Sequence, residues 1–160
     1  MGRSIEAIKP DNIGEIEFSV NRILLATDGS APAIMATKYA IALSKMFSAS
    51  LKIVFVDTAE EQINYNDNIA IIDTPKETRP STAGLTIAQI YADKNGINYT
   101  TEVIKGNVAK TIIRSASDYE ADLIIIGNTG RTGLKRLTLG SVAEAVVKSS
   151  SIPVLVIKGN

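Results

Sequence analysis

The chain has 160 residues with 17 basic and 17 acidic side chains, a formal net charge of zero, and neither cysteine nor histidine. This length fits one domain with a sizeable core, while the missing residues exclude disulfides, thiolate nucleophiles, cysteine-based zinc sites and the usual near-neutral general base. The zero net charge gives no electrostatic reason to expect binding to nucleic acid or to an anionic membrane.

The first 20 residues have no regular hydrophobic period, because Pro10, Asn12 and Gly14 interrupt them. We therefore expect residues 1–20 to be an N-terminal extension and residues 21–160 to form a single domain. The extension has no apolar run long enough for a secretory signal, and no stretch of the chain approaches the roughly 18 apolar residues of a membrane span. We expect a cytoplasmic protein that does not enter a membrane.

The expected domain begins with alternating strands and helices. Residues 22–27 are an apolar run too short for a helix, and residues 51–56 are rich in β-branched side chains, so both predict strands. Between them Ser30 can cap a helix with Pro32 in its first turn, and helical spacing continues to residue 47. The stripe expected to face the core consists of Ile34, Ala36, Ala40, Ile41, Leu43 and Phe47.

The middle of the chain is irregular. Residues 58–80 have no hydrophobic period, although residues 69–72 are apolar and could pack as a short segment. So long an irregular stretch is typical of a functional or mobile loop. Helical spacing returns over residues 81–94, and Asn95-Gly96 predicts a left-handed end to that helix.

The rest of the chain repeats the alternation. Strands are predicted at 99–104, 123–126 and 153–157, and helices at 107–119 and 141–149, the former capped by Asn107. Strands that are apolar on both faces and alternate with helices indicate a parallel sheet covered on both sides. The predicted fold is α/β: a single-domain, doubly wound, flavodoxin/Rossmann-like sheet of five parallel strands in the order 3-2-1-4-5.

A ligand site is expected where the strand order reverses, beyond the carboxyl ends of the first and fourth strands. The chain leaves these strands through residues 26–30 and 126–130, which are polar and rich in glycine. The second exit opens the glycine-rich segment, residues 127–141, which leads into the helix that begins at Ser141. Topology and composition therefore point to one crevice.

The glycine-rich segment suits a phosphate. Its glycines can adopt positive φ and let backbone N–H groups approach an anion, and a helix N-terminus adds unpaired donors and partial positive charge. Arg131, Lys135 and Arg136 add charge, and Ser141 adds a hydroxyl. The segment contains neither a Walker A motif nor the dinucleotide-binding glycine motif. From the residues alone, its glycines could equally be turn residues and Ser141 a helix cap.

The spacing Gly127-x2-Gly130-x9-Gly140-Ser141 resembles the ATP-binding signature of the universal stress protein family. The resemblance extends over roughly residues 20–158. It includes the first strand with its exit at 23–30, the apolar strand at 123–126, the residues 142–146 after the signature, and the segment 152–156. That family divides into members that bind ATP and members that lack the signature and do not. The intact signature places this sequence among the expected ATP binders.

The resemblance implies an ATP site, and not a catalytic or protein-bound metal site, with Mg²⁺ or Mn²⁺ carried on the phosphates. The implied site comprises Ala26, Thr27, Asp28, Val56, Ile126, Gly127, Gly130, Arg131, Gly140, Ser141 and Val142. Asp28 would bind the ribose or the adenine, Val56 would offer backbone groups to adenine, and Ala26 would line the base pocket. Alternatively, Asp28 could be a turn carboxylate bonded to the backbone of Ser30. Asn128-Thr129 stands where relatives commonly have Ser-His.

The expected function is that of an ATP-binding stress or regulatory factor with an unknown protein partner. A homodimer through Val154 to Lys158 is expected from the resemblance and because an apolar edge strand would otherwise stay unpaired. At most slow hydrolysis is expected, since the chain lacks a P-loop lysine and the glycine-rich segment holds no carboxylate. The alternatives are a slow ATP hydrolase and a scaffold that binds no nucleotide. An adenylate-cleaving enzyme of the related hydrolase type would need a Ser-Gly-Gly-x-Asp-Ser loop, which residues 27–32 do not provide.

Overall fold

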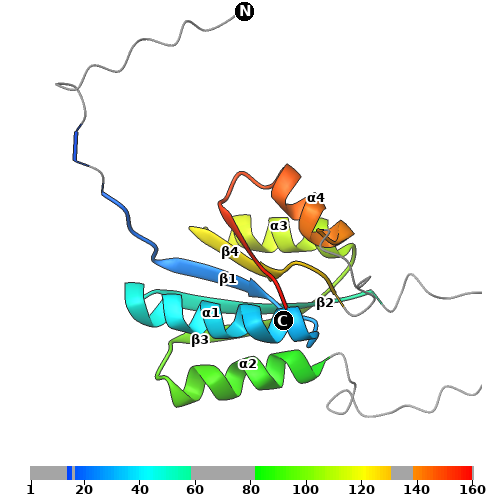
Figure 1. Ribbon diagram of the computed structural model, residues 1–160, viewed down its shortest axis with the longest axis horizontal. Coiled ribbons are helices and arrows are strands. Elements are labelled where there is room, and N and C mark those ends of the chain that lie inside the picture. The colour runs from blue at the N-terminus through cyan, green and yellow to red at the C-terminus, as the bar shows by residue number, and fades with distance from the viewer. Residues whose placement is uncertain (1–13, 16, 59–81, 131–138, 160) are drawn as a thin grey trace, which may run out of the picture.

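The computed structural model describes residues 14, 15, 17–58, 82–130 and 139–159 (Figure 1). They form β1 (Arg22–Ala26), α1 (Ala31–Phe47), β2 (Ser50–Asp57), α2 (Ala83–Lys94), β3 (Tyr99–Lys105), α3 (Val108–Asp118), β4 (Leu123–Gly127), α4 (Ser141–Ser149) and β5 (Val154–Ile157). All strand pairs are parallel and the order is β3-β2-β1-β4-β5. The predicted fold class and strand order are confirmed.

The sheet is covered on both faces, with α1 and α2 on one side and α3 and α4 on the other (Figure 1). Neighbouring residues of β1 therefore enter different cores: Leu25 packs with the first helix pair and Leu24 with the second. Both are fully buried, and burial of a leucine side chain contributes about 1.5–3 kcal/mol. The edge strand β3 departs from this pattern, because most of its side chains are exposed.

The core-facing stripe of α1 differs from the predicted one. Ala36, Ala40 and Ile41 are buried as predicted, and the half-buried Leu43 and Phe47 pack against the same core, whereas Ile34 is only half-buried. The buried residues that were not predicted are Ala33, Thr37 and Ser44. The small side chains let the helix lie close to the sheet. The buried Thr37 hydroxyl is satisfied because it donates to the carbonyl oxygen of Ala33 at 2.9 Å.

Helix ends follow the predicted signals. Ser30 Oγ accepts from Ala33 N at 3.3 Å and Asn107 Oδ1 accepts from Lys110 N at 3.1 Å, so both residues cap their helices. Gly96 adopts the left-handed conformation with φ +63°, as expected after α2. Ser48, at φ 55°, ends α1 in the same way without a glycine.

Residues ahead of β1 also contact the core. Val20 is buried, and the ring of Phe18 meets that of Phe47 edge-to-face with 5.9 Å between centroids. The irregular segment predicted at 58–80 lies outside the described residues except for Thr58, as does most of the predicted extension. Within the part of the chain that is described, no helix is both long and apolar enough to cross a membrane.

Candidate functional site

The exit of β1 is a tightly held turn. Thr27 is buried and its backbone N–H donates to the carbonyl oxygen of Val54 at 3.0 Å. Gly29 takes φ +77°, a conformation that L side chains rarely adopt. Asp28 Oδ1 accepts from Ser30 N at 2.9 Å. The turn role considered for Asp28 is therefore present, and it orients the carboxylate at the carboxyl edge of the sheet.

The exit of β4 is fixed by Asn128. Its backbone N–H donates to the carbonyl oxygen of Ile157 at 2.8 Å, and its carbonyl oxygen accepts from Gly140 N at 2.7 Å. Its side-chain Oδ1 accepts from Gly159 N at 3.4 Å. One residue thus joins the ends of β4 and β5 to the start of α4, so that both described ends of the glycine-rich segment lie together.

The described glycines of this segment, Gly127, Gly130 and Gly140, lie close to neighbouring atoms and do not adopt positive φ. A Cβ on Gly127 would lie 2.8 Å from Pro32 Cβ, a Cβ on Gly140 would lie 2.9 Å from Asn128 O, and one on Gly130 would lie 2.9 Å from Asp28 Oδ2. Among the described glycines, only Gly29, Gly96 and Gly106 have positive φ. The expected positive φ is therefore wrong for these three. Close packing of β4 against α1 explains Gly127 and packing of the β4 exit against the start of α4 explains Gly140, whereas Gly130 meets only the end of the Asp28 side chain. The short distance between Gly130 and Asp28 Oδ2 also shows that the exits of β1 and β4 lie side by side.

The N-terminus of α4 faces the same edge. Gly140 is its N-cap residue and supplies no side-chain hydrogen bond, whereas Ser141, considered above as a possible cap, is the first residue of the helix and is exposed. Helix N-termini leave backbone N–H groups without intrahelical partners, and these groups favour anions. Arg131, Lys135 and Arg136, the predicted source of additional charge, lie outside the described residues.

The residues predicted to surround the base belong to one face of the sheet. Val56 and Ile126 are buried in the core beneath α3 and α4, and Ala26 packs against the same cluster, as does Val108 of α3. Ala26 pairs with Val54 in the β1–β2 ladder, and Val56 follows two residues later. The structure thus brings the side chains of all three predicted residues to the side of the sheet that carries α4.

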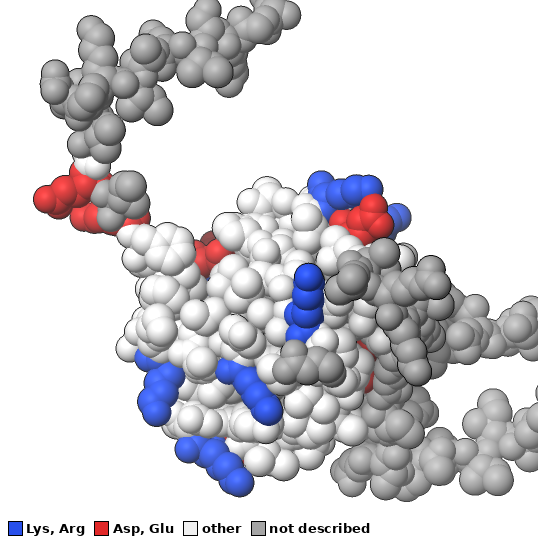
Figure 2. Space-filling view, in the orientation of Figure 1, with Lys and Arg blue, Asp and Glu red and all other residues white. Residues whose placement is uncertain are grey.

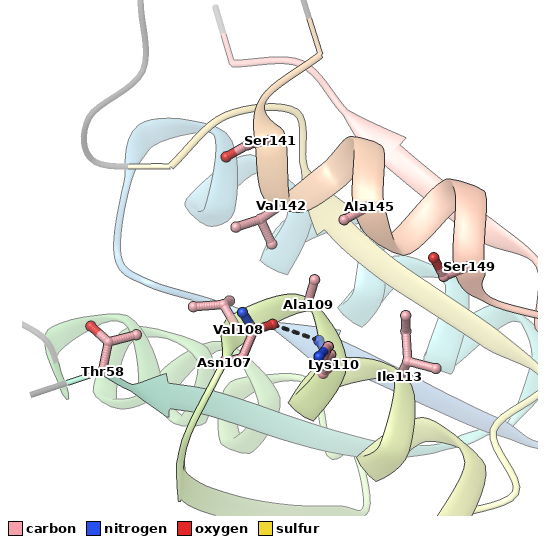
Figure 3. Close-up of a pocket in the computed structure, with 10 residues that line it drawn as sticks. All are labelled: Thr58, Asn107, Val108, Ala109, Lys110, Ile113, Ser141, Val142, Ala145 and Ser149. Atoms are coloured by element: carbon pink, nitrogen blue, oxygen red, sulfur yellow. Dashed lines mark hydrogen bonds between the residues drawn. The ribbon is translucent and has the colours of Figure 1, made fainter. Parts of the chain in front are cut away.

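On the same side of the sheet, a groove of about 440 Å³ opens between the N-terminal half of α3 and the length of α4 (Figure 3). It is lined by Thr58, Asn107, Val108, Ala109, Lys110, Ile113, Ser141, Val142, Ala145 and Ser149. Only Ser141 and Val142 were predicted site residues. The α3 residues were missed because helical spacing identifies a helix but does not show which neighbouring helix its first turn will approach. The signal that could have found them is topological, since α3 starts at the carboxyl edge of the sheet.

Charge is distributed sparsely around this framework. On the face shown in Figure 2, Lys and Arg side chains at the lower left and centre are surrounded by uncharged surface, and those at the upper right lie beside acidic side chains. On α4, Lys148 forms an ion pair with Glu144, and this hydrogen bond lowers the pKa of the Glu144 carboxyl. Within the described ranges, no three Asp or Glu side chains group in a way that could hold a metal ion.

Comparison with known proteins adds a family and a set of similar folds. The model of the universal stress protein family matches residues 19–158. Universal stress protein MJ0531 of Methanocaldococcus jannaschii is 35% identical over 140 residues, which cover 86% of this chain and 81% of that protein.

Two solved structures share the fold. A universal stress protein in complex with cAMP aligns with TM-score 0.67 and 22% identity over 89% of this chain and 100% of its own. The universal stress protein from Archaeoglobus fulgidus in complex with dAMP aligns with TM-score 0.63 and 19% identity, over 87% of this chain and 98% of its own.

Proposed function

The chain belongs to the universal stress protein family, and on that premise we propose that it binds an adenine nucleotide, ATP, at the carboxyl edge of β1 and β4. The observation that carries this proposal is the convergence of three elements. The turn that holds Asp28, the exit of β4 and the N-terminus of α4 meet around Gly130 and Gly140. Two proteins of the same fold were solved with cAMP and with dAMP, which share the adenine and phosphate chemistry of ATP.

The phosphates would lie at the start of α4. There the backbone N–H groups of Ser141 and Val142 belong to the first turn and have no intrahelical acceptor. Each favourable charge interaction with a helix terminus contributes about 0.3–1 kcal/mol, so several donors are needed to hold a triphosphate. A Ser141 hydroxyl can add another, and Mg²⁺ or Mn²⁺ bound to the phosphate oxygens would offset their charge.

The adenosine would extend from there across the exit of β1. Asp28 accepts from Ser30 N through Oδ1, and this bond would hold the carboxylate toward the ribose hydroxyls. The base would lie against the half-buried Ala26, at the edge of the apolar cluster that also contains the buried side chains of Val56 and Ile126. Apolar surface below the base and a carboxylate at the sugar are the pattern of a pocket that orients its ligand with few polar groups.

We propose regulation rather than catalysis as the outcome of binding. The chain has no histidine or cysteine to act as a base or nucleophile, and the glycine-rich segment has no carboxylate to orient an attacking water. At most slow hydrolysis follows. A ligand that binds one conformation better than another is enough to change the surface offered to a protein partner.

The proposed assembly is a homodimer through β5. In the described part of the chain, β5 pairs with β4 on one side and forms the sheet edge on the other. Leu155 packs toward α1, whereas Val154 and Val156 pack toward α4. An apolar strand with an open edge favours pairing with a second copy. We place this dimer in the cytoplasm, where an ATP pool would load it.

The test compares wild type with Gly140→Asp in thermal unfolding with and without ATP. At about 100 times its dissociation constant, ATP should stabilise the wild type by roughly 2.7 kcal/mol. A carboxylate beside the phosphates should remove that shift. An equal increase in stability in both proteins would mean that the nucleotide binds elsewhere. No increase in the wild type at millimolar ATP would favour the alternative of a scaffold that binds no nucleotide.

A further inference from the structure

The first turn of α2 touches the turn that carries Asp28, and it does so through Gly84. A Cβ on Gly84 would lie 2.5 Å from Gly29 N, 2.7 Å from Thr27 Oγ1 and 2.9 Å from Gly29 Cα. Two of these three atoms belong to the backbone, so they cannot rotate away. The turn at 27–29 can occupy its position only because residue 84 has no side chain.

This turn has little room to yield. Thr27 N is bonded to Val54 O at 3.0 Å, Asp28 Oδ1 is bonded to Ser30 N at 2.9 Å, and Gly29 is held at φ +77°. The Asp28 side chain faces Gly130 at the exit of β4. The two hydrogen bonds hold the turn together, so any displacement of the turn by α2 carries Asp28 with it.

We propose that Gly84 is a positioning residue of the nucleotide site, which sets the place of Asp28 and so decides how tightly the adenosine end of the ligand is held. This inference rests on the proposed function. The proposed phosphate end is independent of Gly84, because Gly140, Ser141 and Val142 belong to the start of α4, which covers the opposite face of the sheet from α2. A change at residue 84 should therefore separate adenosine binding from phosphate binding.

The experiment measures the affinities of adenosine, ATP and inorganic tripolyphosphate by calorimetric titration of the full chain. In Gly84→Ala, adenosine and ATP should bind about tenfold more weakly, a change equivalent to about 1.4 kcal/mol. Tripolyphosphate should stay within about twofold of wild type. Gly140→Ala should weaken tripolyphosphate binding and leave adenosine binding unchanged, because its Cβ would meet Asn128 O at 2.9 Å and Thr129 Cα at 3.2 Å at the start of α4.

Gly14→Ala is the matched control, because no atom lies within 4 Å of a Cβ there, and it should leave all three affinities unchanged. Alanine is a better helix former than glycine, so a purely structural role for Gly84 would change the melting temperature and leave the ratio of adenosine to tripolyphosphate affinity untouched. An unchanged ratio in Gly84→Ala overturns the inference. A wild type that binds neither adenosine nor ATP overturns the proposed function instead.

A second variant covers the case in which Gly84→Ala fails to fold. Thr27→Ala removes the hydroxyl that lies against Gly84 and adds no atom, whereas Thr27→Ser keeps that hydroxyl. The same hydroxyl accepts from Gly29 N at 3.4 Å and so helps to hold the turn. Thr27→Ala should therefore weaken adenosine binding, by less than Gly84→Ala does, and leave tripolyphosphate binding unchanged, whereas Thr27→Ser should resemble wild type. Equal behaviour of the two Thr27 variants would contradict the inference.

Discussion

Asp28→Asn separates the two roles of the Asp28 side chain. The amide keeps an oxygen that can accept from Ser30 N, as Oδ1 does at 2.9 Å, so the turn is retained. It replaces the carboxylate that would accept from the ribose hydroxyls. Hydrogen bonds to charged groups contribute about 1.5–3 kcal/mol, which corresponds to a roughly 10- to 150-fold weaker affinity for adenosine and ATP. The stability of the ligand-free protein should change by less than about 0.5 kcal/mol.

Asp28→Ala is the partner variant, since it removes both roles. Its loss of adenosine affinity should match that of Asp28→Asn, and loss of the bond to Ser30 N should add a destabilisation of about 1 kcal/mol. Urea unfolding without ligand and calorimetric titration with adenosine measure the two quantities separately. If Asp28→Asn binds adenosine as wild type does, Asp28 is only a turn residue and the assignment of the ribose site is refuted.

Three further predictions concern the core, the dimer and pH. Ile124 is fully buried, so Ile124→Ala should lower the free energy of unfolding by about 2–5 kcal/mol in urea titrations. Val147 is exposed, so Val147→Ala should change the free energy of unfolding by less than about 0.5 kcal/mol. Comparable losses in the two variants would contradict the burial of Ile124. Val156→Lys, in the edge strand β5, should convert the dimer to a monomer in light scattering. Val103→Lys, at an exposed position of the other edge strand β3, should leave the dimer intact. A dimer that survives Val156→Lys would exclude pairing through β5. Lys148 lowers the pKa of Glu144, so their interaction stabilises the fold above the ordinary carboxyl pKa and is lost as the pH falls through the lowered value. The melting temperatures of wild type and Lys148→Met should therefore converge in acid. A constant difference between them down to pH 2 would show that this ion pair does not stabilise the fold.

The element order could be predicted because local signals and the global fold agree. The apolar run of β4 and the caps at Ser30 and Asn107 have local causes, so their positions follow from neighbouring residues. The core-facing stripe of α1 could not be predicted fully. Its burial of Thr37 and Ser44 depends on how closely the helix approaches the sheet, which is a property of the packed pair.

The site was predictable only where it follows from topology. The exits of β1 and β4 must meet if the strand order is 3-2-1-4-5, and they do. The contact of Gly84 with Gly29 gives no sequence signal, because one glycine in a helical pattern is common and the two residues lie on separate elements. Val108 and Lys110, which line the groove, could have been found from topology, because α3 starts at the carboxyl edge of the sheet.

A crystal structure of the protein with ATP would locate the nucleotide. We expect phosphate oxygens within hydrogen-bonding distance of the N–H groups of Ser141 and Val142, the ribose hydroxyls at Asp28, and adenine against Ala26 and Val56. ATP bound anywhere else, or bound here in the reverse direction with its phosphates at Asp28, would contradict this placement.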